Sequence, residues 1–504
     1  MKLVALPSLP VVDFDLIKEF FEIVFRREIQ NNEDLIFRKL LFSTLCQLSY
    51  FDGSLLIIKD CCVIEKTLQF LNQNISNLTK LQDSSNLNDL FLYSLRTLMF
   101  LVSKIPEEFI HSNAISFLNI FHLSMAGQVN CKITLEVVKT LCFIVTFTYS
   151  SSLVQFQEVI PTFLKFTDLI CCFDRLTTFH KQILILICII FNTIITSNFQ
   201  GISIYGNKIV VSHLKLLKYC LNKKENHFIT DDRLLIGVGT CLWSCIIKFS
   251  VTIEKFVEME GLYSILNLID QTNHLVQNVY LGLLTDLCLN PHCIPHICTW
   301  RSTDKTNTLI SLLIRVWKDE EGRIGVKRTE NGCIADIELP LMGTNQWHES
   351  FHSKINNDYS PAITTMFGFI RPKVYSIRKI LLNNSQLCEK SREYYKILLC
   401  NISIEDSITF CVVDQFFRFV QGQVWAEVIR YIRESGIIPA GNDGEMLLVM
   451  RQRHRKFALY VRDRQKKILR DAKRLEMIKE KNELEKTRNV ALISILIGFK
   501  KLMN

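Results

Sequence analysis

Residues 445–496 read EMLLVMRQRHRKFALYVRDRQKKILRDAKRLEMIKEKNELEKTRNVALISIL. This stretch contains neither glycine nor proline, and most of its residues are strong helix formers. We therefore expect one long helix here, whose basic amphipathic part covers residues 444–488. Turn residues are scarce throughout, with 18 Gly and 10 Pro in 504 residues, which favours an all-α fold for the chain as a whole.

The long helix also carries the net charge of the chain. Residues 451–490 contain 15 Lys or Arg and 6 Asp or Glu, a net charge of +9 that equals the formal net charge of all 504 residues. Solvated helices usually interleave the two signs, because opposite charges four residues apart attract. Residues 451–474 instead hold 11 basic and 2 acidic residues, which predicts an acidic partner. The expected electrostatic partner-binding residues are Arg451, Arg453, Arg455, Lys456, Arg462, Lys466, Lys467, Arg470, Lys473 and Arg474.

A partial apolar seam follows the same helix at heptad spacing. His454, Arg464 and Asp471 interrupt the seam, so it suits a partner helix better than an autonomous coiled coil. The expected apolar partner-binding residues are Leu447, Met450, Phe457, Val461, Ile468, Leu475 and Ile478. A merely solvated helix stays open as an alternative. Nucleic acid is disfavoured as a partner, because aromatic residues are sparse in the basic stretch and the rest of the chain is neutral.

The chain before the basic helix repeats a simple pattern up to about residue 295. Apolar segments of helical length alternate with short polar breaks such as residues 72–77 and 222–226. Pairs of such segments recur about every 40 residues, the period of HEAT and armadillo arrays. We expect an armadillo/HEAT-like helical solenoid over residues 1–298, and an irregular helical bundle remains the alternative. The Gly237-Val238-Gly239 step is expected to mark close helix packing.

The pattern changes after Pro291. Asn331-Gly332 is a good hairpin-turn signal, so we expect a small β-hairpin with strands at 323–330 and 333–339 inside an irregular insertion over residues 299–369. A helical subdomain is expected over residues 370–438. A glycine-containing hinge then precedes the basic helix, and an apolar tail occupies residues 489–504.

Catalytic and metal-binding signals are weak. Residues His348, Glu349 and His352 fit the His-Glu-x-x-His spacing of zinc hydrolases, but their polar flanks favour an exposed loop. Cysteine and histidine crowd together between Cys288 and Cys298, yet no second ligand pair follows, as structural zinc sites usually require. We therefore expect no enzyme, no catalytic or metal-binding residue, no cofactor and no small-molecule substrate.

Membrane insertion and disulfides are also disfavoured. The apolar run Ile183–Phe191 is far shorter than the roughly 20 residues that span a bilayer, so no membrane span is expected. The 18 cysteines lie scattered on apolar segments and no signal peptide precedes them, which is typical of buried thiols in the cytoplasm.

Several strings in the C-terminal third are distinctive. They are Thr299-Trp300-Arg301, Ser311–Trp317, Gly325–Arg328, Ile370–Arg378 and Gly422–Glu427. In this order they resemble the cilia- and flagella-associated protein 69 family of armadillo-like axonemal proteins, most closely over residues 300–436. Family members are longer at the N-terminus, so the chain is expected to correspond to their C-terminal part.

The resemblance implies a non-enzymatic scaffold in the axoneme of the motile cilium or sperm flagellum, needed for flagellar assembly and beating. Its implied place is the central-pair apparatus, and its implied partners are other central-apparatus proteins and the microtubule surface. Two alternatives stay open from the residues alone. One is a soluble adaptor that calmodulin or another acidic partner regulates through the basic helix. The other is a metal-dependent hydrolase built on His348, Glu349 and His352.

Overall fold

The computed structural model describes residues 14–26, 32–50, 52–80, 85–107, 109, 114–128, 131–147, 158–173, 176–197, 202–221, 231–342, 366, 369–383, 389–400 and 402–502. Within these ranges the regular secondary structure is helical and no strand occurs. The chain divides into two compact units, residues 1–264 and 265–504, and α14 (Gly261–Gln271) crosses the boundary. An all-α fold is therefore confirmed for the described residues.

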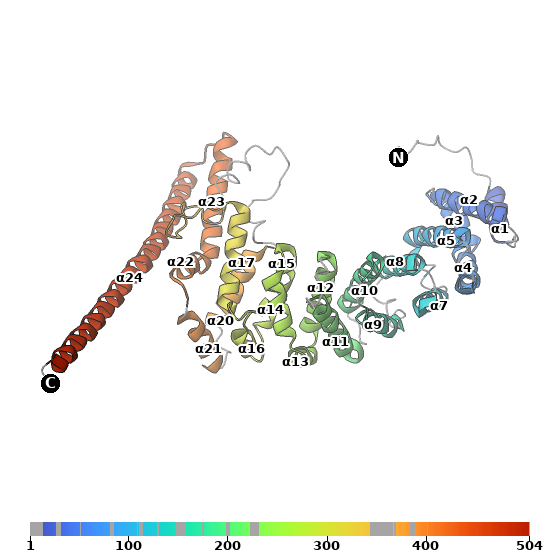
Figure 1. The fold of residues 1–504 in the computed structure, drawn as a ribbon. Helices are drawn as coiled ribbons and strands as arrows, with labels where there is room; N and C mark the ends of the chain where they lie inside the picture. The colour runs from blue at the N-terminus through green and yellow to red at the C-terminus, as the bar shows by residue number, and fades with distance from the viewer. Residues whose placement is uncertain are drawn as a thin grey trace. The chain divides into compact units, whose positions relative to one another are not determined.

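Unit 1 is a stack of helices joined by short connections (Figure 1). Its helices are α1 (Phe14–Arg26), α2 (Asn32–Leu48), α3 (Asp52–Asp60), α4 (Val63–Lys80), α5 (Ser85–Lys104), α7 (Ala114–Leu123) with the π-helical turn η1 (Ser124–Gln128), α8 (Cys131–Phe147), α9 (Val159–Ile170), α10 (Thr178–Thr196), α11 (Ile202–Leu221), α12 (Asp232–Lys248) and α13 (Ser250–Glu258).

These helices form two layers. In one layer α2, α5, α8, α10 and α12 each pack on the next, and in the other α4, α7, α9, α11 and α13 do the same. This is the architecture of a helical-repeat array, in which each helix pair buries its apolar face against its neighbours. Successive helices of the first layer begin at Ser85, Cys131, Thr178 and Asp232. The spacing is therefore longer than the period of about 40 residues expected from the sequence.

Helix α10 packs between α8 and α12 in the first layer. By length and composition it is the one helix among the described residues that could cross a membrane. Its Ile187, Ile190 and Phe191 are buried, and it packs against α8 and α12, so it serves as a core helix of the stack. A Cβ added to Gly237 of α12 would lie 3.2 Å from the Cβ of Cys188 in α10, which confirms close helix packing at this glycine.

Unit 2 brings the remaining helices together. They are α15 (His274–Leu287), α16 (Ile294–Thr299), α17 (Leu309–Ile324), α20 (Ile370–Asn383), α21 (Glu389–Cys400), α22 (Ile404–Val413), α23 (Phe416–Glu434) and α24 (Gly441–Leu502). Helices α15 and α17 pack against α20, α16 packs against α21, and α22 and α23 both pack against α24.

The prediction of a β-hairpin is wrong, because its two strands do not form. Arg323 and Ile324 belong to the last turn of α17, which ends at Ile324 and is capped by Gly325 with a left-handed φ of 86°. The tight turn at Asn331-Gly332 does form, since Gly332 N donates to Thr329 O over 2.9 Å. Beyond it, Arg328 and Ile334 make a single isolated bridge. The first expected strand is shortened because it starts inside α17, and the guanidinium of Arg328 binds Glu321 of that helix.

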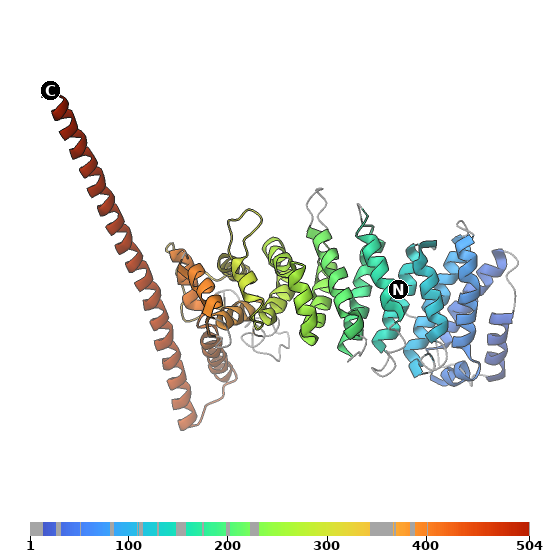
Figure 2. The ribbon, with the colours of Figure 1, turned by 90° about the horizontal axis from the view of Figure 1, so that it is seen from below.

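Helix α24 is longer than the sequence pattern suggested. It begins at Gly441 and runs to Leu502, so it includes part of the expected hinge and the apolar tail from residue 489. Figure 2 shows its C-terminal half projecting away from the other helices of unit 2. Residues 473–493 are all exposed. A helix rises 1.5 Å per residue, so about 30 residues beyond Ala472 form a rod of roughly 45 Å.

Candidate protein-docking surface

The first half of α24 packs against α22 and α23 through a narrow face. Ala458, Val461 and Gln465 are fully or almost fully buried against α22 and α23. The Gln465 side-chain amide donates to the backbone oxygen of Ile408, the two atoms lying 3.3 Å apart. Their spacing of three and four residues places all three on one side of the helix, and this leaves the opposite side facing solvent.

A glycine sets the closest approach between α23 and α24. A Cβ added to Gly422 would lie 1.8 Å from Nδ1 of His454, so any side chain there would displace the imidazole. His454 Nε2 donates to the backbone oxygen of Glu338, the two atoms lying 3.0 Å apart, and its ring stands edge-on to Phe419. His454, which was expected to interrupt the apolar seam, therefore joins α24 both to α23 and to Glu338 in the segment after α17.

The predicted apolar seam divides into two parts. Val461 is buried and Leu447, Met450, Phe457 and Ile468 are half-buried. Phe457 packs on Phe419 of α23, with ring centroids 5.2 Å apart, so this first part already has an intramolecular neighbour. Leu475 and Ile478, which are 60% and 47% exposed, form the second part on the projecting rod.

The predicted basic residues all lie on the solvent side of α24. They are the exposed side chains of Arg451, Arg453, Arg455, Lys456, Arg462, Lys466, Lys467, Arg470, Lys473 and Arg474. We call this set the basic face. Arg455 forms an ion pair of 3.2 Å with Glu338. In the part of the chain that the structure describes, the other nine have no ion-pair partner, so the basic face presents a largely uncompensated positive field.

Part of the basic face borders a cleft. Lys466, Arg470 and Lys473 line a cavity of about 430 Å³, together with Leu469, Asp463 and, from the tight turn, Asn331. Three cations and one carboxylate give this cavity a net positive lining. Carboxylate or phosphate groups of a partner are the ligands that such a lining attracts.

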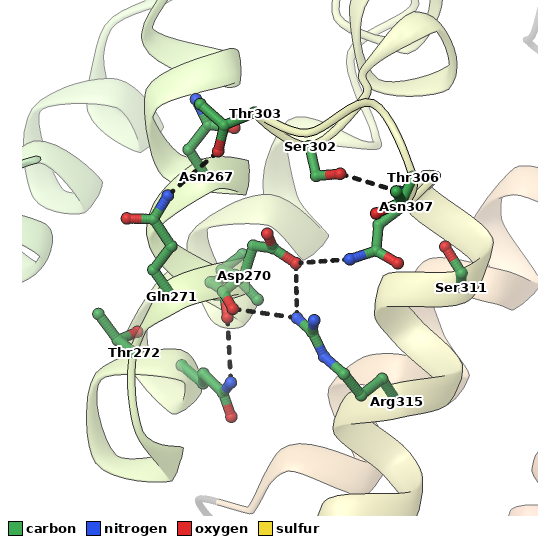
Figure 3. A network of polar contacts seen from close by, with 12 residues as sticks. Asn267, Asp270, Gln271, Thr272, Ser302, Thr303, Thr306, Asn307, Ser311 and Arg315 are labelled. Carbon is green, nitrogen blue, oxygen red and sulfur yellow. Dashed lines mark hydrogen bonds and ion pairs between the residues drawn. The ribbon is translucent and has the colours of Figure 1, made fainter.

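The helices behind α24 are joined by polar networks built from the distinctive strings. Arg315 Nη2 lies 2.6 Å from Oδ1 of Asp270 and also donates to the backbone oxygen of Asp270 (Figure 3). The Asn307 amide donates to the same carboxylate over 3.4 Å. Nearby, the buried Trp300 donates its indole hydrogen to Asn267 over 2.9 Å. These contacts fasten α17 and the loop before it to α14.

Two further polar clusters are more deeply buried. Trp317 Nε1 donates to Oε1 of Glu321 over 2.6 Å, and Arg328 binds the other carboxylate oxygen. Arg378 makes a two-pronged ion pair with Asp414 and lies over the Phe410 ring, 3.7 Å from its centroid. Paired and hydrogen-bonded in this way, the charges are tolerated inside the unit. The unusual polar strings are therefore structural elements of the part of unit 2 that holds α24, residues 265–434, which we call the platform.

Arg371 is the most buried cation of this platform. Its side chain is 1% exposed and donates to the backbone oxygen of Leu341 over 2.6 Å. Burial lowers the pKa of its guanidinium to about 10, and the nearby Glu320 and Glu321 oppose that shift. Sequence reasoning recognised the string but not its role, because nothing in the sequence shows that Arg371 is buried.

The residues considered for metal binding do not form a site among the described residues, where no group of three or more His, Cys, Asp or Glu side chains is placed to hold an ion. Cys288, Cys293 and Cys298 are buried, and burial raises the pKa of each thiol, so each is protonated at neutral pH. His292 is exposed. His348, Glu349 and His352 lie outside the described residues.

Comparison with known proteins places this platform in a family. A family model described as "Cilia- and flagella-associated protein 69, ARM repeat" matches residues 153–428. Cilia- and flagella-associated protein 69 of Homo sapiens is 28% identical over 262 residues, which cover 52% of this chain and 26% of the human protein. The Mus musculus protein of the same name is 30% identical over 201 residues, covering 40% of this chain and 20% of the mouse protein.

The chain thus spans about a quarter or less of the length of these relatives. The family match begins at residue 153 and ends at residue 428, within α23, so it includes helices α9 to α13 of the array and most of the platform, but neither α1–α8 nor α24. It covers more than half of the chain and agrees with the layered helices of unit 1. The chain belongs to the cilia- and flagella-associated protein 69 family through its armadillo-repeat region.

Proposed function

We propose that the chain is a non-enzymatic scaffold of the axoneme in motile cilia or sperm flagella, located in the central-pair apparatus and needed for flagellar assembly and beating. The observation that carries the proposal is the armadillo-repeat family match over residues 153–428, and the names of the relatives supply the ciliary address. Helical arrays offer long surfaces for binding other proteins. The partners are other central-apparatus proteins, and the microtubule surface is a further candidate.

Within this role, the basic face of α24 is the proposed docking surface for an acidic partner. Two features support it: nine exposed cations without an ion-pair partner among the described residues, and the platform that orients them. Surface charges attract over about 10 Å at 0.1 M salt, so the contact forms quickly and weakens as salt is added.

A soluble adaptor regulated by calmodulin is the second candidate. Calmodulin binds an amphipathic helix by enclosing its apolar side chains. In the folded chain Val461 is buried and Phe457 packs on Phe419, so α24 would have to leave α23 before calmodulin could enclose it. The structure thus supplies an argument for the scaffold role over this alternative. A calcium-dependent mobility shift of the full chain with calmodulin would favour the adaptor.

The docking surface is tested by binding the purified chain to detergent-extracted axonemes at increasing salt. Neutralising Lys466, Lys467, Arg470 and Lys473 together by Gln should weaken binding about tenfold or more, if each exposed charge contributes some tenths of a kcal/mol. The same change should make the remaining binding less sensitive to salt.

A matched control removes four positive charges from the projecting rod of the same helix: Lys479, Lys481, Lys486 and Arg488, each replaced by Gln. These side chains alternate with Glu480, Glu483 and Glu485, so their loss should change binding less than about twofold. Equal losses in both variants would show that net charge alone governs binding, and the basic face would then have no specific role.

A further inference from the structure

A separate cleft lies between α23, the start of α24 and residues 336–339. Its volume is about 430 Å³, within the range of ligand pockets in proteins. One stripe of α23 forms a long wall: Trp425, Ile429 and Arg433 succeed one another at four-residue spacing and all line the cleft. The opposite side is built by Leu339 and Arg451. The cleft therefore runs along more than two turns of a helix.

The cleft is fixed in shape by contacts already described. His454 fills the space beside Gly422 and donates to the backbone oxygen of Glu338. Arg455 adds an ion pair to the Glu338 carboxylate at 3.2 Å. These contacts join all three walls, so a ligand would find the site formed. Preformed sites bind more tightly because little conformational entropy is lost on binding.

The lining combines apolar surface with unpaired positive charge. Trp425 and Ile429 are half-buried and turn apolar surface toward the cavity. Two of the three carboxylates at the cleft are paired with an arginine, Glu338 with Arg455 and Glu434 with Arg430 at 4.0 Å. The third, Asp336, accepts from the backbone N–H of Glu338 and keeps its charge. Arg433 and Arg451 are exposed, and within the described ranges no ion pair neutralises either of them.

We propose that this cleft binds a short peptide segment of a partner protein, in which a bulky apolar side chain stands next to carboxylates. The apolar side chain contacts Trp425, Ile429 and Leu339, and the carboxylates pair with Arg433 and Arg451. Tryptophan and arginine are the residue types that dominate binding energy at protein interfaces. This site shares Arg451 with the basic face but otherwise has its own lining, and it does not depend on the ciliary role.

The test uses the full chain and a fluorescein-labelled peptide of sequence GSELFEESG, with binding followed by fluorescence polarisation. Companion peptides replace the Leu-Phe pair by Gly-Gly or every Glu by Lys. The first peptide should bind at least about tenfold more tightly than either companion, because one companion lacks the apolar side chains and the other lacks the carboxylates. Equal binding of all three peptides would overturn the proposal.

Variants separate this cleft from the basic face. Replacing both Arg433 and Arg451 by Gln should weaken binding of the first peptide about tenfold. Replacing Lys479 and Lys481 by Gln removes the same charge from α24 at residues that belong neither to the cleft nor to the basic face, and it should leave binding within about twofold. All four positions are exposed, so folding should be unaffected, and circular dichroism checks this. If both variants lose affinity equally, the peptide is held by the general charge of α24 and the cleft is not its site.

Discussion

The contact between Gly422 and His454 makes a quantitative prediction. In Gly422→Ala the new Cβ would lie 1.8 Å from Nδ1 and 2.5 Å from Cγ of the imidazole, far inside van der Waals contact. The imidazole ring must move away by about 1 Å or more, and it then loses its hydrogen bond to Glu338 and its contact with Phe419. We expect overpacking to cost about 1–3 kcal/mol and the lost hydrogen bond about 1 kcal/mol. Alanine returns up to about 1 kcal/mol as a better helix former than glycine.

The net expectation is a loss of about 2 kcal/mol in the packing of α24 on α23. Native-state hydrogen exchange of the backbone amides of residues 454–465 measures this loss, because it reports the free energy of local opening even in a chain with two units. A change of 2 kcal/mol corresponds to exchange about 30-fold faster. Gly444→Ala is the matched control: no atom lies within 4 Å of its added Cβ, so exchange should be unchanged or slower.

A double-mutant cycle decides whether His454 is the cause. In the background of His454→Ala, the same Gly422→Ala change should be neutral or mildly stabilising, because the clash has been removed. The reasoning is refuted if Gly422→Ala leaves exchange unchanged in the wild-type background. It is also refuted if the loss is equally large without the imidazole.

Two further predictions concern buried polar groups. Burial lowers the pKa of His213 to about 4 from the ordinary 6.5. As pH falls, protons bind the unfolded chain first, so unit 1 should lose up to about 3 kcal/mol between pH 6.5 and 4. His213→Leu should flatten that part of the pH dependence of the unfolding free energy, and an unaltered slope would contradict the assignment. Asp414→Asn leaves the buried Arg378 without its counter-ion and should cost about 3–5 kcal/mol, whereas Glu434→Gln at an exposed ion pair should cost less than about 1 kcal/mol. Urea denaturation of the two variants compares these losses, and equal values would count against a structural role for the Arg378 pair.

The helical class follows directly from the sequence, since apolar periodicity and the scarcity of glycine and proline are local properties. The two layers could not be predicted in detail, because they depend on which apolar faces meet across the stack. The spacing of the repeats was underestimated for the same reason. The pattern of α10 is apolar on most sides, and only its packing between α8 and α12 identifies it as a core helix.

The hairpin illustrates a conflict between local and tertiary signals. Asn331-Gly332 forms its turn as expected, and Gly332 has a φ of 75° that other residues rarely adopt. The flanking residues do not extend into strands: Arg323 and Ile324 belong to α17, and the Arg328 side chain binds a carboxylate of that helix. A side chain can bind a distant partner without leaving any trace in the periodicity of its own segment.

The sequence predicts which residues of α24 are exposed, but only some of the residues that anchor the helix to α22 and α23. The basic residues lie on the exposed side of α24, as their charge required. Ala458 and Gln465, which help to anchor the helix, were outside the predicted seam because neither fits an apolar heptad. Gly422 was the available signal: a glycine in the middle of a helical pattern indicates a close neighbour. Its partner His454 could not be identified, since 32 positions separate the two residues in the sequence.

Retention in the axoneme tests the central proposal most directly. A tagged chain expressed in ciliated cells is followed by immunoblotting of detergent-extracted axonemes and of the soluble fraction. A scaffold of the central apparatus should stay with the axonemes after extraction, and the Gln variant of Lys466, Lys467, Arg470 and Lys473 should be released at lower salt than the wild-type chain. Release of the wild-type chain with the soluble fraction would contradict the proposed function.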